Sequence, residues 1–225
     1  MESRELAPKV MATYQAVIDL FREGADLNNL TVSEITAKAG IGKGTAYEYF
    51  SNKEEMIAGA LFHELKSECQ DMCRQLKEEK GLYARMDRVL INMEKKMVEI
   101  NCFVRAIQVL MDNSAVSGKL RELMENRKDE DMLVMDVIRL ILEQEIEAEN
   151  SLSKEEGAYL AMAVFSKLIC FALYQFDHEN RIGIDGMTMR GMLCSDVCRD
   201  VEYYRHNRKG DETAREHKKK EIGFL

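Results

Sequence analysis

The stretch AGIGKGTAYEYFSNKEEM, residues 39–56, holds three glycines within five positions, followed by closely spaced tyrosines. Such glycine density is typical of a phosphate-binding loop or of a tight turn between helices. A phosphate-binding loop requires G-x-x-x-x-G-K-[ST] after a buried strand, but here Lys43 precedes Gly44 and position 37 is alanine. A dinucleotide-binding loop is excluded because its third glycine would fall on Thr45. We therefore interpret this stretch as a turn.

The residues around these glycines predict two short helices. Thr31 and Glu34 form a T-x-x-E capping box, in which the threonine hydroxyl accepts a backbone N–H and the glutamate reaches back. Gly40 suits the left-handed conformation that ends a helix, and Gly42 can cap the next one. A short helix, a turn and a second short helix, packed on a longer first helix, form a helix-turn-helix arrangement.

The composition of the whole chain favours an all-α protein. Its 225 residues contain a single proline, Pro8, and 15 methionines, while 46% are hydrophobic and 32% charged. These proportions are typical of a globular chain with long uninterrupted helices, and no alternating pattern indicates strands. Helices are expected over 8–24, 32–38, 43–50, 53–81, 82–100, 102–112, 118–149, 153–177 and 186–206.

Charge and cysteine content exclude several classes of protein. The net charge of −8 argues against non-specific coating of nucleic acid. The N-terminus MESRELAPKV has no apolar signal core, and no stretch approaches 18 uncharged apolar residues, so we expect a cytoplasmic protein with no membrane partner. The six cysteines are interpreted as buried thiols, although the pairs 69/73 and 194/198 have a spacing that could offer ligands to zinc. We expect no metal and no cofactor.

Residues 31–61, TVSEITAKAGIGKGTAYEYFSNKEEMIAGAL, resemble the N-terminal signature of the TetR family of transcriptional repressors. The shared features are a capped helix, A-G-[IV], G-T-x-Y-x-Y-F, and N-K-E-E before an apolar helix. The rest of the chain carries no comparable signature. The resemblance implies an N-terminal three-helix helix-turn-helix DNA-binding domain followed by a helical ligand-binding and dimerisation domain. It also implies a homodimer that binds double-stranded operator DNA and responds to an unidentified small-molecule effector.

We place the domain boundaries where the character of the chain changes. Residues 1–52 form the expected helix-turn-helix domain, and 53–206 the expected effector-binding and dimerisation domain, which starts with a long linking helix. Residues 207–225 are rich in lysine and arginine and are expected to form a charged, solvated C-terminal tail.

The candidate DNA-binding residues lie in and beside the second short helix. Lys43 and Lys53, at the starts of two helices, can reach phosphate oxygens beside the groove. Glu48 departs from the family pattern, and it either accepts a hydrogen bond from a cytosine amino group or faces solvent. The resemblance implies that Thr45 and Tyr49 hold phosphate and that Tyr47 lies at base edges or backbone. The predicted set is Thr31, Lys43, Thr45, Tyr47, Glu48, Tyr49 and Lys53.

The later helices offer candidates for effector binding and for dimerisation. Helix 153–177 is apolar nearly all round, so we expect a second copy to cover it, and a charge at Ala172 is predicted to impair dimerisation. Methionines and aromatic residues suggest a deformable interior for a small apolar effector, although the same residues are also consistent with ordinary core. The candidates are Met97, Phe103, Ile107, Met135 and Phe165.

Two other functions compete with this interpretation. A helical enzyme could use a cysteine nucleophile, since the chain holds Cys102, His63 and His178, but no sequence context supports a Cys–His pair. A helical adaptor that binds other proteins is the second alternative. Specific, titratable binding of duplex DNA would distinguish a repressor from the enzyme and from the adaptor.

Overall fold

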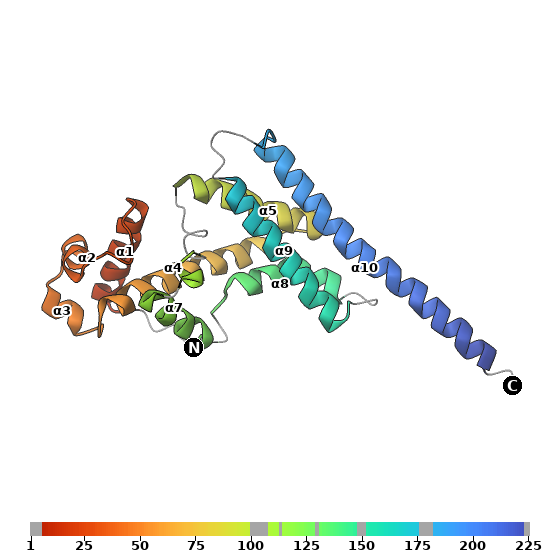
Figure 1. Cartoon of the computed structure of the whole chain (residues 1–225), viewed down its shortest axis with the longest axis horizontal. Coiled ribbons are helices and arrows are strands. Elements are labelled where there is room, and N and C mark those ends of the chain that lie inside the picture. The colour runs from red at the N-terminus through yellow and green to blue at the C-terminus, as the bar shows by residue number, and fades with distance from the viewer. Residues whose placement is uncertain are drawn as a thin grey trace. The chain divides into compact units, whose positions relative to one another are not determined.

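The structure is a computed structural model, and every regular element among its described residues is a helix (Figure 1). It describes residues 6–99, 108–112, 114–128, 131–147, 152–175 and 182–222. The helices pack into two units. The first comprises Met1–Asp71 with Lys95–Leu133, and the second comprises Met72–Glu94 with Val134–Leu225. The domain boundaries after residues 52 and 206 remain predictions, because they divide the chain by expected function rather than by packing.

The first unit begins with three helices joined by two short connections. Helix α1 spans Pro8–Arg22, α2 spans Val32–Ala39 and α3 spans Lys43–Tyr47, and both α2 and α3 pack against α1. Proline occupies the first turn of α1, where its missing N–H has no intrahelical partner to lose. Helix α3 has only five residues and is shorter than expected, with a hydrogen-bonded turn continuing to Phe50.

The fourth helix, α4 (Lys53–Leu76), starts at a side-chain cap. The Asn52 side chain accepts the Glu55 N–H at 2.8 Å, and the Glu55 carboxylate accepts the Ser51 N–H at 2.7 Å. Asn52 is therefore the N-cap, and the Glu55 carboxylate binds the backbone of the residue that precedes Asn52. The helix ends at Leu76 rather than at the predicted Gly81.

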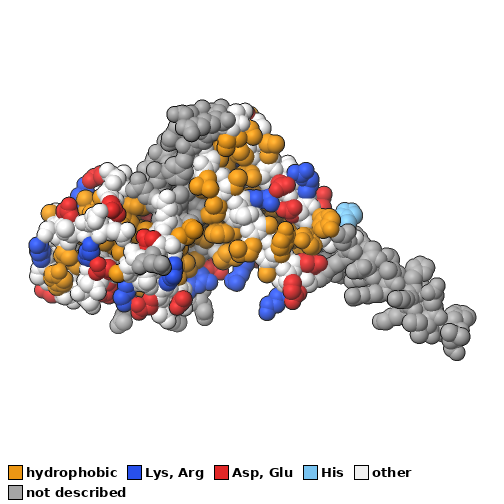
Figure 2. All heavy atoms as spheres, in the orientation of Figure 1, with side chains coloured by type: hydrophobic (Ala, Val, Ile, Leu, Met, Phe, Trp, Pro, Cys, Tyr) orange, Lys and Arg blue, Asp and Glu red, His pale blue; other side chains and the backbone are white. Residues whose placement is uncertain are grey.

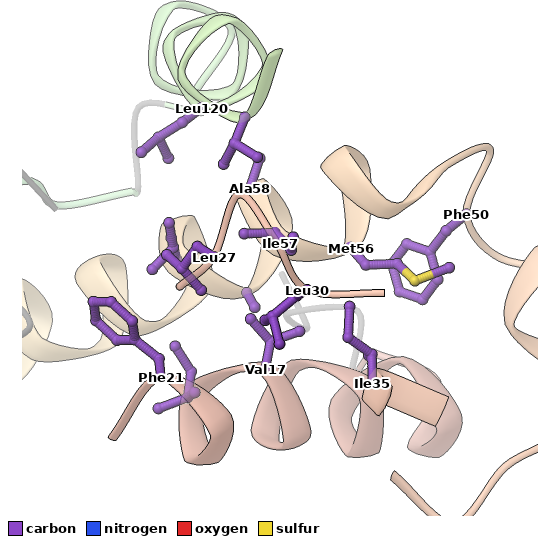
Figure 3. Close-up of a cluster of buried hydrophobic side chains, with 14 of the residues drawn as sticks. Val17, Phe21, Leu27, Leu30, Ile35, Phe50, Met56, Ile57, Ala58 and Leu120 are labelled. Carbon is purple, nitrogen blue, oxygen red and sulfur yellow. The ribbon is translucent and has the colours of Figure 1, made fainter. Parts of the chain in front are cut away.

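A shared hydrophobic core holds α1, α2, α3 and α4 together with a later helix, α7 (Ala115–Glu125). Figure 3 shows Leu30 and Ile35 facing α1 and α4, while Leu120 reaches toward the same cluster from α7. Each fully buried aliphatic side chain stabilises the fold by about 1.5–3 kcal/mol. The core includes Val17, Phe21, Leu27, Leu30, Ile35, Ala46, Phe50, Met56, Ile57, Val116 and Leu120.

The second unit contains α5 (Leu82–Glu99, whose last residues belong to the first unit), α8 (Val134–Glu147), α9 (Lys154–Tyr174) and α10 (Gly186–Ile222). Helix α9 packs against both α8 and α10. The predicted capping box at its start is confirmed, since the Ser153 hydroxyl accepts the Glu156 N–H and the Glu156 carboxylate accepts the Ser153 N–H. Lys167, half-buried on α9, pairs with Asp196 at 3.0 Å and Asp200 at 2.8 Å on α10.

Two helix predictions for the later part of the chain were wrong. A single helix over 118–149 is replaced by α7 and α8, with a break centred on Asp131. The buried Asp131 carboxylate accepts the Lys128 N–H and pairs with Lys66 at 3.1 Å, so it stabilises a turn where a helix was expected. Helix α10 continues to Ile222 instead of ending at 206, because the lysine- and glutamate-rich segment holds no proline.

Helix α9 is long and apolar enough to cross a membrane by length and composition, with 28% of its most apolar window buried. A core helix has the same composition, and α9 packs between two neighbours here. Ala172 is 0% exposed inside its own protomer, so a charge there acts first on the fold of that protomer, and its effect on dimerisation stays a prediction. The outward stripe of α9 instead carries Tyr159, Met162 and Leu173.

Candidate nucleic-acid interface

The turn between α2 and α3 has the backbone geometry that the glycines predicted. Gly40 ends α2 in the left-handed conformation, with φ 67° and ψ 28°, and the Ile41 N–H reaches back to the Thr36 carbonyl at 3.0 Å. Gly42 is the N-cap of α3 and supplies no side-chain hydrogen bond. The orientation of α3 therefore depends on its packing and on the placement of α2.

Two buried side chains determine which face of α3 points outward. Ala46 and Phe50 lie in the core of the first unit, and Tyr14 packs against the Phe50 ring at 5.8 Å between centroids. On the opposite face, Tyr47 is 54% exposed and Tyr49 is 43% exposed. The face of α3 that points away from the core thus presents aromatic and polar groups to solvent. Lys43 and Glu48 are exposed beside these tyrosines, and Thr45 is half-buried.

Thr31 uses its hydroxyl inside the capping box. The hydroxyl accepts the Glu34 N–H at 3.2 Å and donates to the Glu34 carboxylate at 2.7 Å, while the Thr31 N–H donates to the same carboxylate at 2.8 Å. These bonds from Thr31 lower the pKa of Glu34. The Thr31 hydroxyl proton is therefore used in the cap of α2, and a contact of Thr31 with DNA stays a prediction.

Lys53 lies at the first position of α4 and is half-buried. Its Nζ donates to the backbone carbonyls of Asn28, at 2.9 Å, and Leu30, at 3.1 Å, both in the connection between α1 and α2. An ammonium group has three donors, so one remains for another acceptor. Sequence patterns could not reveal these carbonyl partners, because they lie more than twenty positions earlier in the chain.

Comparison with known proteins agrees with this arrangement. Residues 19–60 match the model of the family described as "Bacterial regulatory proteins, tetR family", and this match covers the helix-turn-helix and the start of α4. This N-terminal region is of the tetR type. The match confirms the resemblance drawn from the G-T-x-Y-x-Y-F and N-K-E-E motifs. Members of the family are regulators of transcription and not enzymes.

The fold of this chain is similar to that of solved bacterial regulators over most of its length. The fatty acid degradation regulator FadR from Bacillus halodurans matches with a TM-score of 0.61 and 14% identity, covering 83% of this chain and 96% of that one. FadR from Bacillus subtilis, solved in complex with stearoyl-CoA, matches with a TM-score of 0.58, 14% identity and the same coverages.

A putative fatty acid metabolism regulator from Clostridium perfringens has a TM-score of 0.55 and 18% identity, and it again covers 83% of this chain and 96% of its own. No curated protein matches the sequence significantly. At such identities the likeness shows the fold, which includes a helical domain after the helix-turn-helix.

Two of the five candidate effector residues have side chains that the structure describes. Met135 is 37% exposed on α8, and Phe165 is half-buried on α9. Phe103 and Ile107 lie outside the described residues, as does the side chain of Met97. The assignment of these five residues to an effector site thus stays a prediction.

Among the cysteines that the structure describes, Cys69, Cys73 and Cys194 are buried, Cys198 is half-buried and Cys170 is exposed. Burial first, and then the nearby Asp87 and Cys198, raise the pKa of Cys194 to about 12. Burial likewise raises the pKa of Cys73. These thiols therefore stay protonated at neutral pH and act as small core side chains. No group of metal-ligating side chains occurs in the part of the chain that the structure describes.

Proposed function

We propose that this chain is a cytoplasmic homodimeric repressor that binds double-stranded operator DNA through α3 and leaves it when a small apolar effector binds. The exposed face of α3, with Tyr47, Tyr49, Lys43 and Glu48 pointing away from the anchored Ala46, is the observation that supports this most directly. Lys43 and the hydroxyls of Thr45, Tyr47 and Tyr49 contact phosphates and thereby position the protein on the duplex. Contacts with base edges determine which DNA sequence is bound.

Selection from a random pool of duplexes tests operator binding. Repeated capture on the purified protein should enrich a two-fold symmetric sequence, because each protomer of a dimer reads one half-site. Half-sites separated by about one helical turn are expected. Recovery of an unenriched pool after several rounds would contradict the proposal.

Glu48 is expected to read a base in each half-site. It is exposed at the end of α3 beside Tyr47, where a carboxylate can accept a hydrogen bond from a cytosine amino group. The Glu48→Ala variant should therefore lose about 1–3 kcal/mol of discrimination at one base pair. Binding to the selected operator and its single-base variants, measured across a salt series, checks this. An unchanged base preference would place Glu48 in solvent.

The effector proposed here is a small molecule with a long apolar part. The solved FadR from Bacillus subtilis holds stearoyl-CoA, and this chain shares its fold over 83% of its length. Fatty acids and their coenzyme A thioesters are accordingly the first compounds to test. Met97, Phe103, Ile107, Met135 and Phe165 are the proposed contacts, and methionine suits such a site because its thioether adapts to irregular shapes.

Effector and operator are expected to weaken each other's binding by the same factor. A coupling of about 1–3 kcal/mol, or 5- to 150-fold in affinity, is typical of such linkage. Titration of an identified acyl compound into free protein and into the protein–operator complex measures both sides. If saturating operator leaves the affinity for that compound unchanged, the compound does not act through this equilibrium.

Dimerisation is proposed to occur through α9 and α10. Figure 2 shows hydrophobic side chains gathered over these two helices. The exposed members on α9 are Tyr159, Met162 and Leu173, and those on α10 are Met187, Met192 and Tyr203. A patch of this kind on a globular protein marks an interaction site, and a second copy covers it with the same surface.

A further inference from the structure

The connection between α1 and α2 is held in place at several points. The Asp26 carboxylate accepts the Asn28 N–H at 3.0 Å and the Asn29 side-chain amide at 2.7 Å, while the Asp26 carbonyl accepts the Leu30 N–H. Leu27 and Leu30 are buried in the core of the first unit (Figure 3). The N–H groups and apolar side chains of this connection are thus satisfied from within.

Two carbonyl groups of the connection between α1 and α2 accept hydrogen bonds from another helix. Lys53 of α4 donates to the carbonyls of Asn28 and Leu30, and no carboxylate partner of its ammonium occurs among the described residues. A cation in the first turn of a helix is electrostatically unfavourable, because the N-terminus of a helix is its positive end. Two backbone carbonyl oxygens, that of Asn28 in an exposed hydrogen bond and that of Leu30 in a part-buried one, offset that cost. The position of the ammonium is therefore set by the connection.

The connection in turn determines where α2 begins. Leu30, whose carbonyl Lys53 binds, directly precedes Thr31, the N-cap of α2. Helix α3 has only five residues and no side-chain cap, and it follows α2 after a three-residue turn that starts at Gly40. A shift of the Leu30 carbonyl would therefore move the start of α2 and, through α2, the exposed face of α3.

We propose that Lys53 is a positioning residue for operator recognition, which acts by fixing the connection between α1 and α2 so that α3 meets the bases in register. This inference rests on the operator-binding function proposed above. It differs from the role expected from the sequence, in which Lys53 only contacts phosphate. A phosphate contact strengthens binding to every duplex alike, whereas a positioning residue matters only where base edges must be met.

The Lys53→Met variant distinguishes these roles, since methionine keeps the apolar stem and removes the donors. Its affinity for the selected operator is expected to fall by about tenfold or more, as for one lost base contact. Its affinity for a random-sequence duplex of the same length, and the dependence of operator binding on salt, should match the parent. Lys43→Met is the matched control, because Lys43 is exposed with no such carbonyl partners. That variant should weaken both duplexes equally and reduce the salt slope by about one.

Binding is measured well below the unfolding temperature, which far-UV circular dichroism establishes for each variant. If Lys53→Met is unfolded there, Lys53→Gln, which keeps an N–H donor without the charge, is measured under the same criteria. Equal weakening of both duplexes with a smaller salt slope would overturn the positioning role in favour of a phosphate contact. Unchanged operator affinity would also overturn it. A parent protein that binds no duplex specifically would overturn the operator-binding function, and this inference with it.

Discussion

The Ala172→Asp variant is expected to lose the folded state of the second unit. Ala172 is 0% exposed on α9, next to Phe171, which is also fully buried. An uncompensated charge in such a place costs about 3–5 kcal/mol, which is a large part of the roughly 5–15 kcal/mol that stabilises a typical domain. Urea unfolding followed by far-UV circular dichroism should show a much lower midpoint.

Ala158→Asp is the matched control for this prediction. Ala158 is an exposed alanine on the same helix, so the same substitution there leaves the carboxylate in water. Its unfolding midpoint should stay within the range of ordinary surface substitutions, about 0.5 kcal/mol. If Ala172→Asp and Ala158→Asp unfold at the same urea concentration, Ala172 is not buried inside the protomer.

The double variant Met162→Glu with Leu173→Glu is expected to keep its fold and to lose its dimer. Both residues are 57% exposed on α9, so a single protomer tolerates the charges. In the proposed dimer the same two residues of each copy would bring like charges into a dry interface, which is strongly unfavourable. Sedimentation at micromolar concentration should show twice 25.9 kDa for the parent and 25.9 kDa for the variant.

Operator affinity should fall together with the dimer, by about 10²- to 10⁴-fold, because the second half-site is no longer bound by a linked domain. Met135→Glu serves as the control, since it introduces the same charge at an exposed methionine of α8, in the same unit but outside α9 and α10. It should leave both the dimer and operator binding intact. A double variant that stays dimeric would place the interface elsewhere.

Local chemistry in the sequence determined the helix-turn-helix itself. The capping boxes at Thr31 and Ser153 and the left-handed Gly40 each depend on residues within four positions of one another, so the sequence displays all their partners at once. The buried Ala46 and Phe50 follow from helical spacing in the same way. These local features were enough to predict the fold of the first helices, whereas the resemblance to the family rested on the motifs of residues 31–61.

Tertiary structure alone decided the features whose partners lie far apart in the chain. Lys53 meets carbonyls more than twenty positions away, and Leu120 of α7 joins the core of the DNA-binding helices. On α9, nearly every position is apolar, so periodicity could not show that Ala172 faces the protomer while Leu173 faces outward. An amphipathic pattern identifies a buried face only when the other face is polar, and a helix covered on several sides has no such contrast. Which neighbours cover it depends on how the whole chain packs.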